Sequence, residues 1–140
     1  AFLLRHVYKA MFGMPKVDRV CLAIVVDEAH LLAKDATLPR LMKEGRKFGI
    51  SVILASQGMK DFNPDVIDNS GSRIVFRTNH PASKKISEFL SAPKTDALKQ
   101  RVEQLAVGTA YVQTSEMQYS AIVDMQPPLA KRNGAVAPPR

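Results

Sequence analysis

The sequence predicts an α/β protein with a mostly parallel sheet, flanking helices and a β-hairpin near its C-terminal end. Two apolar runs of strand length support this prediction, VCLAIVV at residues 20–26 and ISVILAS at residues 50–56. Continuous apolar runs of this length are typical of strands that are buried on both faces, as they are in parallel sheets. Segments with helical spacing separate the runs, and this alternation indicates a sheet that is covered by helices.

Local signals define the other elements. Residues 2–14 carry apolar side chains at helical spacing until Gly13 and Pro15 end the pattern. Thr37 is expected to cap the next helix, and Gly49 is expected to stop it. The remaining expected elements are a helical turn around residues 66–67, a third strand at 72–78, amphipathic helices at 81–90 and 96–105, and a hairpin of strands at 108–112 and 117–123.

The length and composition are those of one globular domain. The chain has 140 residues, of which 46% are hydrophobic and 24% are charged. No apolar run is long enough to span a membrane, and charges among the first residues argue against a signal peptide. Because the chain begins with Ala, we expect it to be a piece of a longer protein. Residues 126–140 are rich in proline and are expected to form a flexible tail.

The single cysteine and the net charge bear on the compartment and on the kind of partner. Cys21 lies inside the first apolar run, which indicates a buried core thiol and excludes an internal disulfide and a thiolate metal site. The cytoplasm is therefore the expected compartment. The formal net charge of +7 favours an anionic partner, although a solvated basic surface accounts for it equally well.

Two carboxylates, Asp27 and Glu28, follow the first apolar run directly. Ligands of open α/β sheets bind at the carboxyl ends of the strands, and adjacent acids there are costly unless they hold a cation or transfer protons. The pattern is that of a Walker B motif and predicts a site for ATP and Mg²⁺. In this interpretation Asp27 holds Mg²⁺, directly or through water, and Glu28 polarises the water that attacks the γ-phosphate. The alternative is a strand that ends in a solvated acidic turn.

Other polar residues lie at the ends of the next two strands. Gln57 follows the second apolar run, and Arg73 and Arg77 flank the third strand. If the strands are neighbours, these side chains can face one cleft with the two acids. Phosphoryl transfer uses a metal-holding acid, an activator of water, a polar sensor and a cation that stabilises developing charge. The two arginines are therefore candidate nucleotide-binding residues, and a solvated strand edge is the alternative for them.

Three segments resemble the carboxyl-terminal half of the HerA/FtsK-type motor ATPases: VCLAIVVDEAHLL, LPRLMKEGRKFGISVILASQ and NSGSRIVFRTNHP. The resemblance covers roughly residues 20–112, and EGRKFGISVILASQ is its most specific part. It implies a RecA-like P-loop core that assembles as a hexamer and drives DNA, expected to be double-stranded, through a central pore by hydrolysing ATP. An accessory nuclease is a further implied partner.

The resemblance also implies roles for individual residues. Asp27 and Glu28 correspond to the Walker B acids, Gln57 to the sensor after the following strand, and Arg46 to an arginine finger presented to a neighbouring subunit. Without the resemblance, Arg46 is one more cation on a basic helix surface. The two arginines that flank the third strand remain alternative candidates for the finger.

The sequence departs from the family in one respect, since no G-x-x-x-x-G-K-[ST] motif occurs in its 140 residues. The phosphate loop is then expected upstream, so residues 1–125 are expected to be the C-terminal half of a RecA-like ATPase domain. The isolated chain is expected to bind nucleotide weakly and not to hydrolyse it. Ala29 and His30 after the acids favour the HerA branch, because the type IV secretion relatives usually carry an aromatic residue there.

Two other interpretations stay open. The letters DEAH at residues 27–30 also suggest a superfamily-two helicase, but ASQ at residues 55–57 stands where those helicases have Ser-Ala-Thr. The chain also lacks their Q-x-x-G-R-x-G-R motif, and ABC ATPases are disfavoured because no L-S-G-G-Q signature precedes the acids. The second alternative is an assembly or DNA-binding module without catalysis of its own.

Overall fold

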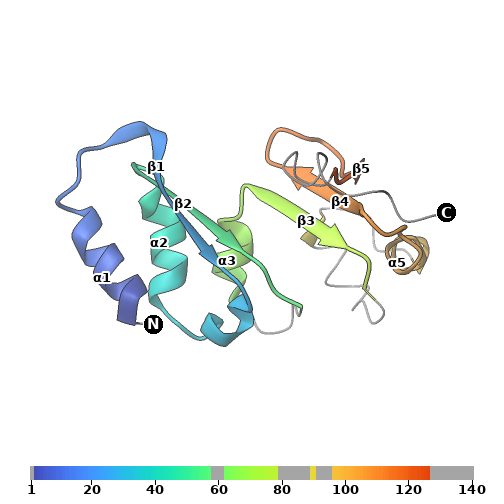
Figure 1. Ribbon diagram of the computed structural model, residues 1–140, viewed down its shortest axis with the longest axis horizontal. Helices are drawn as coiled ribbons and strands as arrows, with labels where there is room; N and C mark the ends of the chain where they lie inside the picture. Colours follow the sequence, from blue (N-terminus) through green and yellow to red (C-terminus); the bar gives the residue numbers. More distant parts are fainter. Residues whose placement is uncertain (1, 58–61, 79–88, 91–95, 127–140) are drawn as a thin grey trace, which may run out of the picture. The chain divides into compact units, whose positions relative to one another are not determined.

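The computed structural model describes residues 2–57, 62–78, 89–90 and 96–126, which fall into two compact units, Ala1–Gly71 and Ser72–Arg140 (Figure 1). The helix expected at residues 81–90 and the tail expected at 126–140 lie, except for residues 89, 90 and 126, outside the described residues. Within the described ranges every helix is too short or too polar to cross a membrane.

The first unit combines two parallel strands with helices. Its elements, in chain order, are α1 (Phe2–Met11), β1 (Val17–Val26), the short 3₁₀ helix η1 (Ala29–Leu32), α2 (Thr37–Gly45), β2 (Phe48–Leu54) and α3 (Pro64–Asp68). The strands β1 and β2 run parallel, and Val26 pairs with Leu54 where both strands end. The α/β class and the parallel pairing of the two apolar runs are therefore confirmed.

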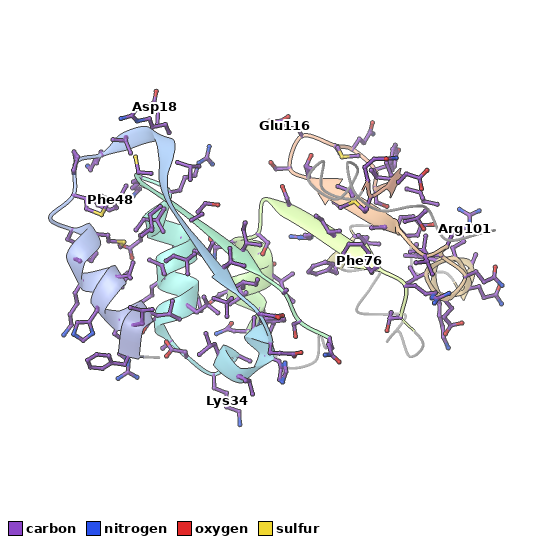
Figure 2. The ribbon with its side chains drawn as sticks, in the orientation of Figure 1. Asp18, Lys34, Phe48, Phe76, Arg101 and Glu116 are labelled. Carbon is purple, nitrogen blue, oxygen red and sulfur yellow. The ribbon has the colours of Figure 1, made fainter. Side chains whose placement is uncertain are left out.

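The hydrophobic core of this unit joins the helices to the strands. Its buried members are Leu4, Met11, Leu38, Leu41, Phe48, Ile50 and Val66, which come from α1, α2, β2 and α3. Phe48, at the start of β2 (Figure 2), makes an edge contact with the ring of Phe12 at a centroid distance of 5.9 Å. The Tyr8 hydroxyl also donates to Glu44 Oε1 at 3.1 Å and links α1 to α2. Full burial of one such aliphatic side chain contributes about 1.5–3 kcal/mol.

The strand β1 is less buried than the sequence predicts. The prediction of a strand buried on both faces, with Cys21 as a core thiol, is wrong, because Cys21 and most of β1 are exposed. Ile24 packs against the core, whereas Val25 and its cross-strand partner Ile53 are 67% and 52% exposed. A buried parallel strand needs a neighbour on each edge and a layer on each face. Among the described residues β1 pairs only with β2.

The helix α2 begins and ends differently from the expectation. Thr37 is its first residue, and the Thr37 N–H donates to Asp35 Oδ1 at 2.7 Å. The side chain that accepts a hydrogen bond from the start of α2 is therefore that of Asp35 and not that of Thr37. A carboxylate just before a helix can reach the free N–H groups of the first helical turn. The helix ends at Gly45, so Gly49 does not stop it.

Gly49 lies in β2 and faces a bulge of β1. The β1–β2 register shifts between Val17 and Leu22, so residues 18–21 of β1 lie opposite Gly49 alone. Gly49 has a φ of +70°, and a Cβ added to it would lie 2.5 Å from the carbonyl oxygen of Arg19. Only glycine fits this place without strain, because it combines a left-handed φ with close backbone approach.

The described part of the second unit contains an antiparallel sheet and the helix α5 (Asp96–Glu103). Its elements are β3 (Ser72–Phe76), α5, β4 (Thr109–Thr114) and β5 (Ala121–Asp124), and the strand order is β3-β4-β5. The predicted hairpin is confirmed as β4 and β5. The third predicted strand also forms, but β3 pairs antiparallel with β4 rather than extending the parallel ladder. The alternation of elements could not reveal this partner, because the choice depends on contacts distant in the sequence.

Gly49→Ala is expected to destabilise the first unit, because the new Cβ overlaps the β1 backbone and an L-residue is strained at this φ. We expect a loss of about 1–3 kcal/mol in the free energy of unfolding, measured by urea denaturation of the chain. Gly71→Ala is the matched control, since a Cβ there meets no atom within 4 Å and should be neutral or slightly stabilising. Equal stabilities for the two variants would contradict the role assigned to Gly49.

Asp35 is expected to make the stability of the first unit depend on pH. Partial burial by itself raises the pKa of the Asp35 carboxyl, but hydrogen bonds from Thr37 and the charge of Arg5 outweigh it and lower the pKa. Such a carboxyl contributes stability above its unfolded pKa of about 3.9, and the contribution is lost as the pH falls through the lower folded pKa. Asp35→Asn should therefore weaken the decline of unfolding free energy in acid, measured by urea titrations across this range. The control is Asp18→Asn, at an exposed position, and parallel profiles for Asp35→Asn and the unchanged chain would refute the assignment.

Candidate active site

The carboxyl ends of β1 and β2 lie side by side, and hydrogen bonds join the segments that follow them. The Ala55 N–H donates to the Val26 carbonyl oxygen at 2.9 Å, and the Ala29 N–H donates to the Ala55 carbonyl oxygen at 2.8 Å. These bonds continue the parallel ladder past the last strand residues. These bonds therefore fix the backbone at the start of the acidic turn after β1 relative to the backbone of the segment after β2.

Glu28 has an unusual backbone conformation. Its φ of 49° and ψ of 44° are left-handed, and no other non-glycine residue in the described part of the chain has a positive φ. The Glu28 N–H donates to Asp27 Oδ1 at 2.9 Å, and its carbonyl oxygen accepts from the Leu31 N–H at 3.0 Å. A left-handed non-glycine residue costs about 1–3 kcal/mol, and such residues cluster at functional sites. The turn at Glu28 is therefore the candidate site of this unit.

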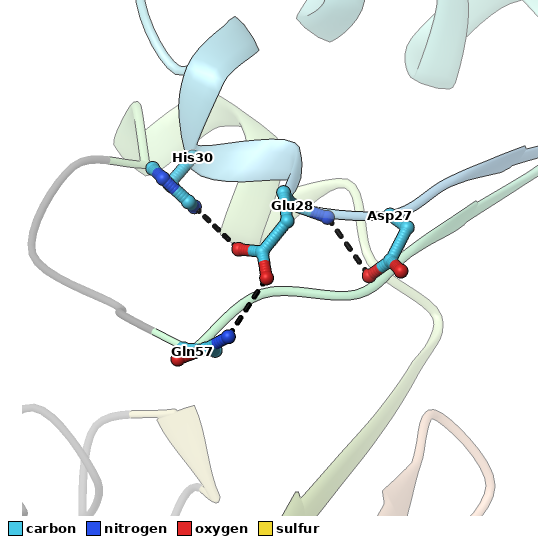
Figure 3. Close-up of polar contacts among 4 residues, drawn as sticks. All are labelled: Asp27, Glu28, His30 and Gln57. Atoms are coloured by element: carbon cyan, nitrogen blue, oxygen red, sulfur yellow. Dashed lines mark hydrogen bonds and ion pairs between the residues drawn. The ribbon is translucent and has the colours of Figure 1, made fainter.

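The carboxylate of Glu28 lies between two side chains, as Figure 3 shows. Its Oε1 accepts a hydrogen bond from Gln57 Nε2 at 2.7 Å, and its Oε2 lies 3.1 Å from His30 Nδ1. The structure thus brings together Glu28 and Gln57, which the sequence predicted as parts of one site. The parallel pairing of β1 and β2 accounts for this, since both residues follow the carboxyl end of a strand.

His30 is the contact of Glu28 that sequence reasoning missed. Its side chain is 36% exposed, but Nδ1 itself is buried and makes no hydrogen bond. The 3.1 Å approach to Glu28 Oε2 is therefore at ion-pair distance for a protonated ring but is not a hydrogen bond. The signal in the sequence is the i, i+2 spacing of the two residues at the start of a tight helical turn.

Asp27 is exposed, and its Oδ1 accepts the hydrogen bond from Glu28. In nucleotide sites Mg²⁺ is usually held by one or two carboxylates together with waters and substrate phosphates. No group of three or more His, Cys, Asp or Glu residues that could hold a metal ion occurs among the described residues. Asp27 could therefore serve as one ligand of a metal ion that nucleotide phosphates and waters also coordinate.

Arg46 lies at the other end of the sheet. It follows α2 and precedes β2, it is exposed, and its carbonyl oxygen accepts from the Gly49 N–H at 3.1 Å. The seven residues of β2 separate Arg46 from the segment that carries Gln57. At about 3.3 Å per residue the two ends lie roughly 20 Å apart. Arg46 therefore does not reach the Glu28 carboxylate of its own chain.

Arg73 and Arg77 belong to the second unit. Arg73 lies near the amino end of β3, where its Nη1 donates to the Phe89 carbonyl oxygen at 2.8 Å and its guanidinium lies 5.5 Å from the Phe89 ring centroid. Arg77 follows the carboxyl end of β3 and is exposed. Arg73 therefore ties residue 89 to the sheet of its own unit, and a nucleotide-binding role for the two arginines stays a prediction.

The arrangement around Glu28 has a definite chemical capacity. A carboxylate that is held beside an amide donor can act as a general base towards a bound water. The Gln57 amide can donate either to that carboxylate or to an oxygen of a ligand. The edge of the sheet where both lie is the edge at which open α/β sheets bind ligands.

Comparison with known proteins gives the relationship of the chain. No protein-family model matches it. It is 34% identical over 110 residues to a probable helicase of Methanocaldococcus jannaschii, covering 74% of this chain and 21% of the relative. It is 30% identical over 107 residues to the DNA double-strand break repair helicase HerA of Sulfurisphaera tokodaii, covering 71% of this chain and 22% of the relative. The chain thus spans about a fifth of the length of these relatives.

Solved structures share its fold. The bacterial conjugative coupling protein TrwB matches with a TM-score of 0.70 and 19% identity, covering 89% of this chain and 36% of TrwB. The genome packaging NTPase B204 of Sulfolobus turreted icosahedral virus 2, in complex with ATP-gammaS, matches with a TM-score of 0.60 and 23% identity, covering 76% of this chain and 52% of B204. The prediction of a partial RecA-like fold, of the kind found in P-loop NTPases, is confirmed. Over about three quarters of its length the chain is a homologue of the HerA-type helicases, with the fold of the FtsK/HerA-type P-loop ATPases.

Proposed function

We propose that this chain is the C-terminal half of the ATPase core of a HerA-type, ATP-driven DNA translocase or helicase. The observation that carries the proposal is the 2.7 Å hydrogen bond from Gln57 Nε2 to Glu28 Oε1 at the carboxyl ends of adjacent parallel strands. Nucleotide hydrolysis needs a base for the attacking water and a polar donor near the terminal phosphate. The homology with HerA-type helicases supports the same activity.

Three residues of the acidic turn and the segment after β2 have distinct roles in this proposal. Glu28 accepts the proton of the water that attacks the γ-phosphate. Gln57 senses the nucleotide, because its amide can exchange the Glu28 carboxylate for a phosphate oxygen. Asp27 would hold Mg²⁺, which neutralises phosphate charge when it is bound. The phosphate loop comes from outside these 140 residues, since they contain no G-x-x-x-x-G-K-[ST] motif.

Arg46 acts on the nucleotide of a neighbouring copy in this proposal. The separation of roughly 20 Å along β2 supports this, because an arginine at the amino end of the strand cannot serve its own Glu28. A site completed by two subunits requires an oligomer, and we propose a hexameric ring. Arginine suits the role since its planar guanidinium can bridge two phosphate oxygens.

DNA is the proposed substrate of the motor, and ATP with Mg²⁺ is the proposed cofactor. The name of the Sulfurisphaera tokodaii relative, DNA double-strand break repair helicase, supports double-stranded DNA. The formal net charge of +7 suits a polyanionic partner. An accessory nuclease completes the proposed assembly.

A non-catalytic assembly module is the second candidate. The observation that favours it is the same missing phosphate loop, because a chain without that loop cannot cradle the phosphates by itself. A full-length protein that binds DNA but does not hydrolyse ATP would favour the module over the motor.

Glu28→Gln in the full-length protein is expected to abolish most ATP hydrolysis while ATP binding survives, because the amide keeps the shape of the side chain but cannot accept the proton. Loss of general-base help typically costs about 10²–10⁴-fold in rate, which a steady-state ATPase assay measures. Glu116→Gln, in the exposed turn between β4 and β5, is the matched control and should hydrolyse ATP normally. Turnover of Glu28→Gln within about threefold of the unchanged protein, well below that range, would exclude Glu28 as the base.

Arg46→Ala in the full-length protein is expected to lower ATP hydrolysis strongly, since an arginine that stabilises transition-state charge contributes about 10³–10⁵-fold. Arg46→Lys should restore little, because an ammonium cannot bridge two oxygens. The exposed neighbours Arg40, Lys43 and Lys47 are the controls, and their replacement by Ala should affect hydrolysis much less. An equal loss in Lys43→Ala would favour a general basic surface instead.

An experiment with mixed subunits distinguishes two possible roles of Arg46, a finger that acts on the neighbouring subunit and a residue that supports its own subunit. Arg46→Ala subunits and Glu28→Gln subunits are each expected to be inactive alone. In mixed rings some interfaces combine an intact Glu28 with an intact Arg46 from the next subunit, so part of the activity should return. Mixtures that form joint oligomers but remain inactive would count against action across the subunit boundary.

A further inference from the structure

One contact of Glu28 has no role in the proposed function, the 3.1 Å approach of His30 Nδ1 to Oε2. Gln57 holds the other oxygen, Oε1. Both carboxylate oxygens are thus contacted (Figure 3), and a general base must present one oxygen to the attacking water. Each oxygen keeps a further lone pair, but a neighbouring side chain occupies part of the space from which water approaches, so the base is most accessible when one of the two contacts opens.

The geometry identifies Gln57 as the contact that opens. Gln57 is exposed and follows β2, whereas Glu28 follows β1 and lies 29 positions earlier in the chain. The only link between the two side chains is one hydrogen bond from a neutral amide, which a phosphate oxygen can accept equally well. Release of Gln57 frees Oε1 and leaves Oε2 in contact with His30.

His30 is held beside Glu28 by the backbone of the turn itself. The Leu31 N–H donates to the Glu28 carbonyl oxygen at 3.0 Å, and the Ala33 N–H donates to the His30 carbonyl oxygen at 3.2 Å. Ala29, between the two residues, is fully buried, and its N–H donates to the carbonyl oxygen of Ala55, the residue that follows β2. The spacing of His30 and Glu28 is therefore set by a tight turn that is anchored through its backbone, and none of these backbone bonds involves the Gln57 side chain.

The environment of the His30 ring also favours a lasting contact. Nδ1 is shielded from solvent and makes no hydrogen bond, so water does not compete for it. Nδ1 can donate in the neutral tautomer that carries its proton there and in the imidazolium. The contact does not meet hydrogen-bond geometry, but catalytic hydrogen bonds are often long or poorly aligned without substrate and tighten in the complex.

We propose that His30 is a positioning residue whose Nδ1 holds Oε2 of Glu28, so that Oε1 faces the attacking water after Gln57 has moved. This inference rests on the proposed function, because it concerns the base of the same site. A base that is oriented by a second group is a recurring arrangement in active sites. His30 touches neither nucleotide nor water in this role and acts through Glu28.

The test measures ATP hydrolysis by the full-length protein with His30 replaced. His30→Ala should lower kcat by about 10–100-fold, by analogy with the loss when the partner that orients a metal ligand is removed, and should leave KM for ATP nearly unchanged. His30→Asn should restore most of kcat, because its amide nitrogen can take the place of Nδ1. The matched control is His6→Ala, which removes an exposed histidine of α1 whose Nδ1 lies 3.1 Å from the Phe2 carbonyl oxygen.

A double-mutant cycle separates positioning from other roles. If His30 acts through Glu28, His30→Ala should cause no further loss when Glu28→Gln is already present. A full additional loss in that background, failure of a folded His30→Asn to restore kcat, or an unchanged kcat in His30→Ala would each overturn the positioning role. A normal rate for Glu28→Gln would instead overturn the proposed function, so the two failures are distinguishable.

Discussion

The parallel pairing of β1 with β2 is the interaction on which the candidate active site depends. Glu28 and Gln57 are 29 positions apart in the chain and meet at 2.7 Å only because both strands end at the same edge. Two backbone hydrogen bonds through Ala55 continue the ladder beyond the strands and fix the starting points of the acidic turn and of the segment that follows β2. The core beneath β2 in turn holds that strand against the helices of the first unit.

Gly49, near the amino end of β2, helps to set the register in which β1 and β2 pair up to their carboxyl ends. The bulge opposite Gly49 absorbs residues 18–21 of β1, after which Leu22–Val26 pair without interruption with Ile50–Leu54. A one-residue slip would turn every following side chain to the other face of the sheet. It would also displace the carboxyl ends relative to each other. A backbone feature at the amino end therefore decides whether the acid and the amide meet at the carboxyl end.

The proposed mechanism has two parts, which lie at opposite ends of β2. Glu28, with its strained backbone, is the proposed base, and Arg46 is the proposed finger for a neighbouring subunit. The left-handed backbone turns the Glu28 carboxylate back towards both Gln57 and His30, and the main-chain bonds of η1 maintain this turn. Arg46 lies at the opposite end of β2, so each copy of the chain carries its proposed base near one end of the strand and its candidate finger near the other. In the proposed ring, this division makes hydrolysis in one subunit depend on the position of the next.

Local sequence patterns were enough to predict most of the described helices and strands and to place two acids in the turn after β1. Apolar runs, helical spacing and the hairpin signal act over a few residues, so they predicted both strands of the parallel pair, the first helix and the hairpin. Long-range contacts in the folded chain are the reason that Cys21 is exposed, that Gly49 faces a bulge and that β3 pairs with β4. Only the folded structure shows that His30 approaches Glu28. Burial and strand partners depend on residues that are distant in the chain, and no local pattern of residue types specifies them. The approach of His30 to Glu28 depends on the left-handed backbone of Glu28, which the residue types around it do not specify either.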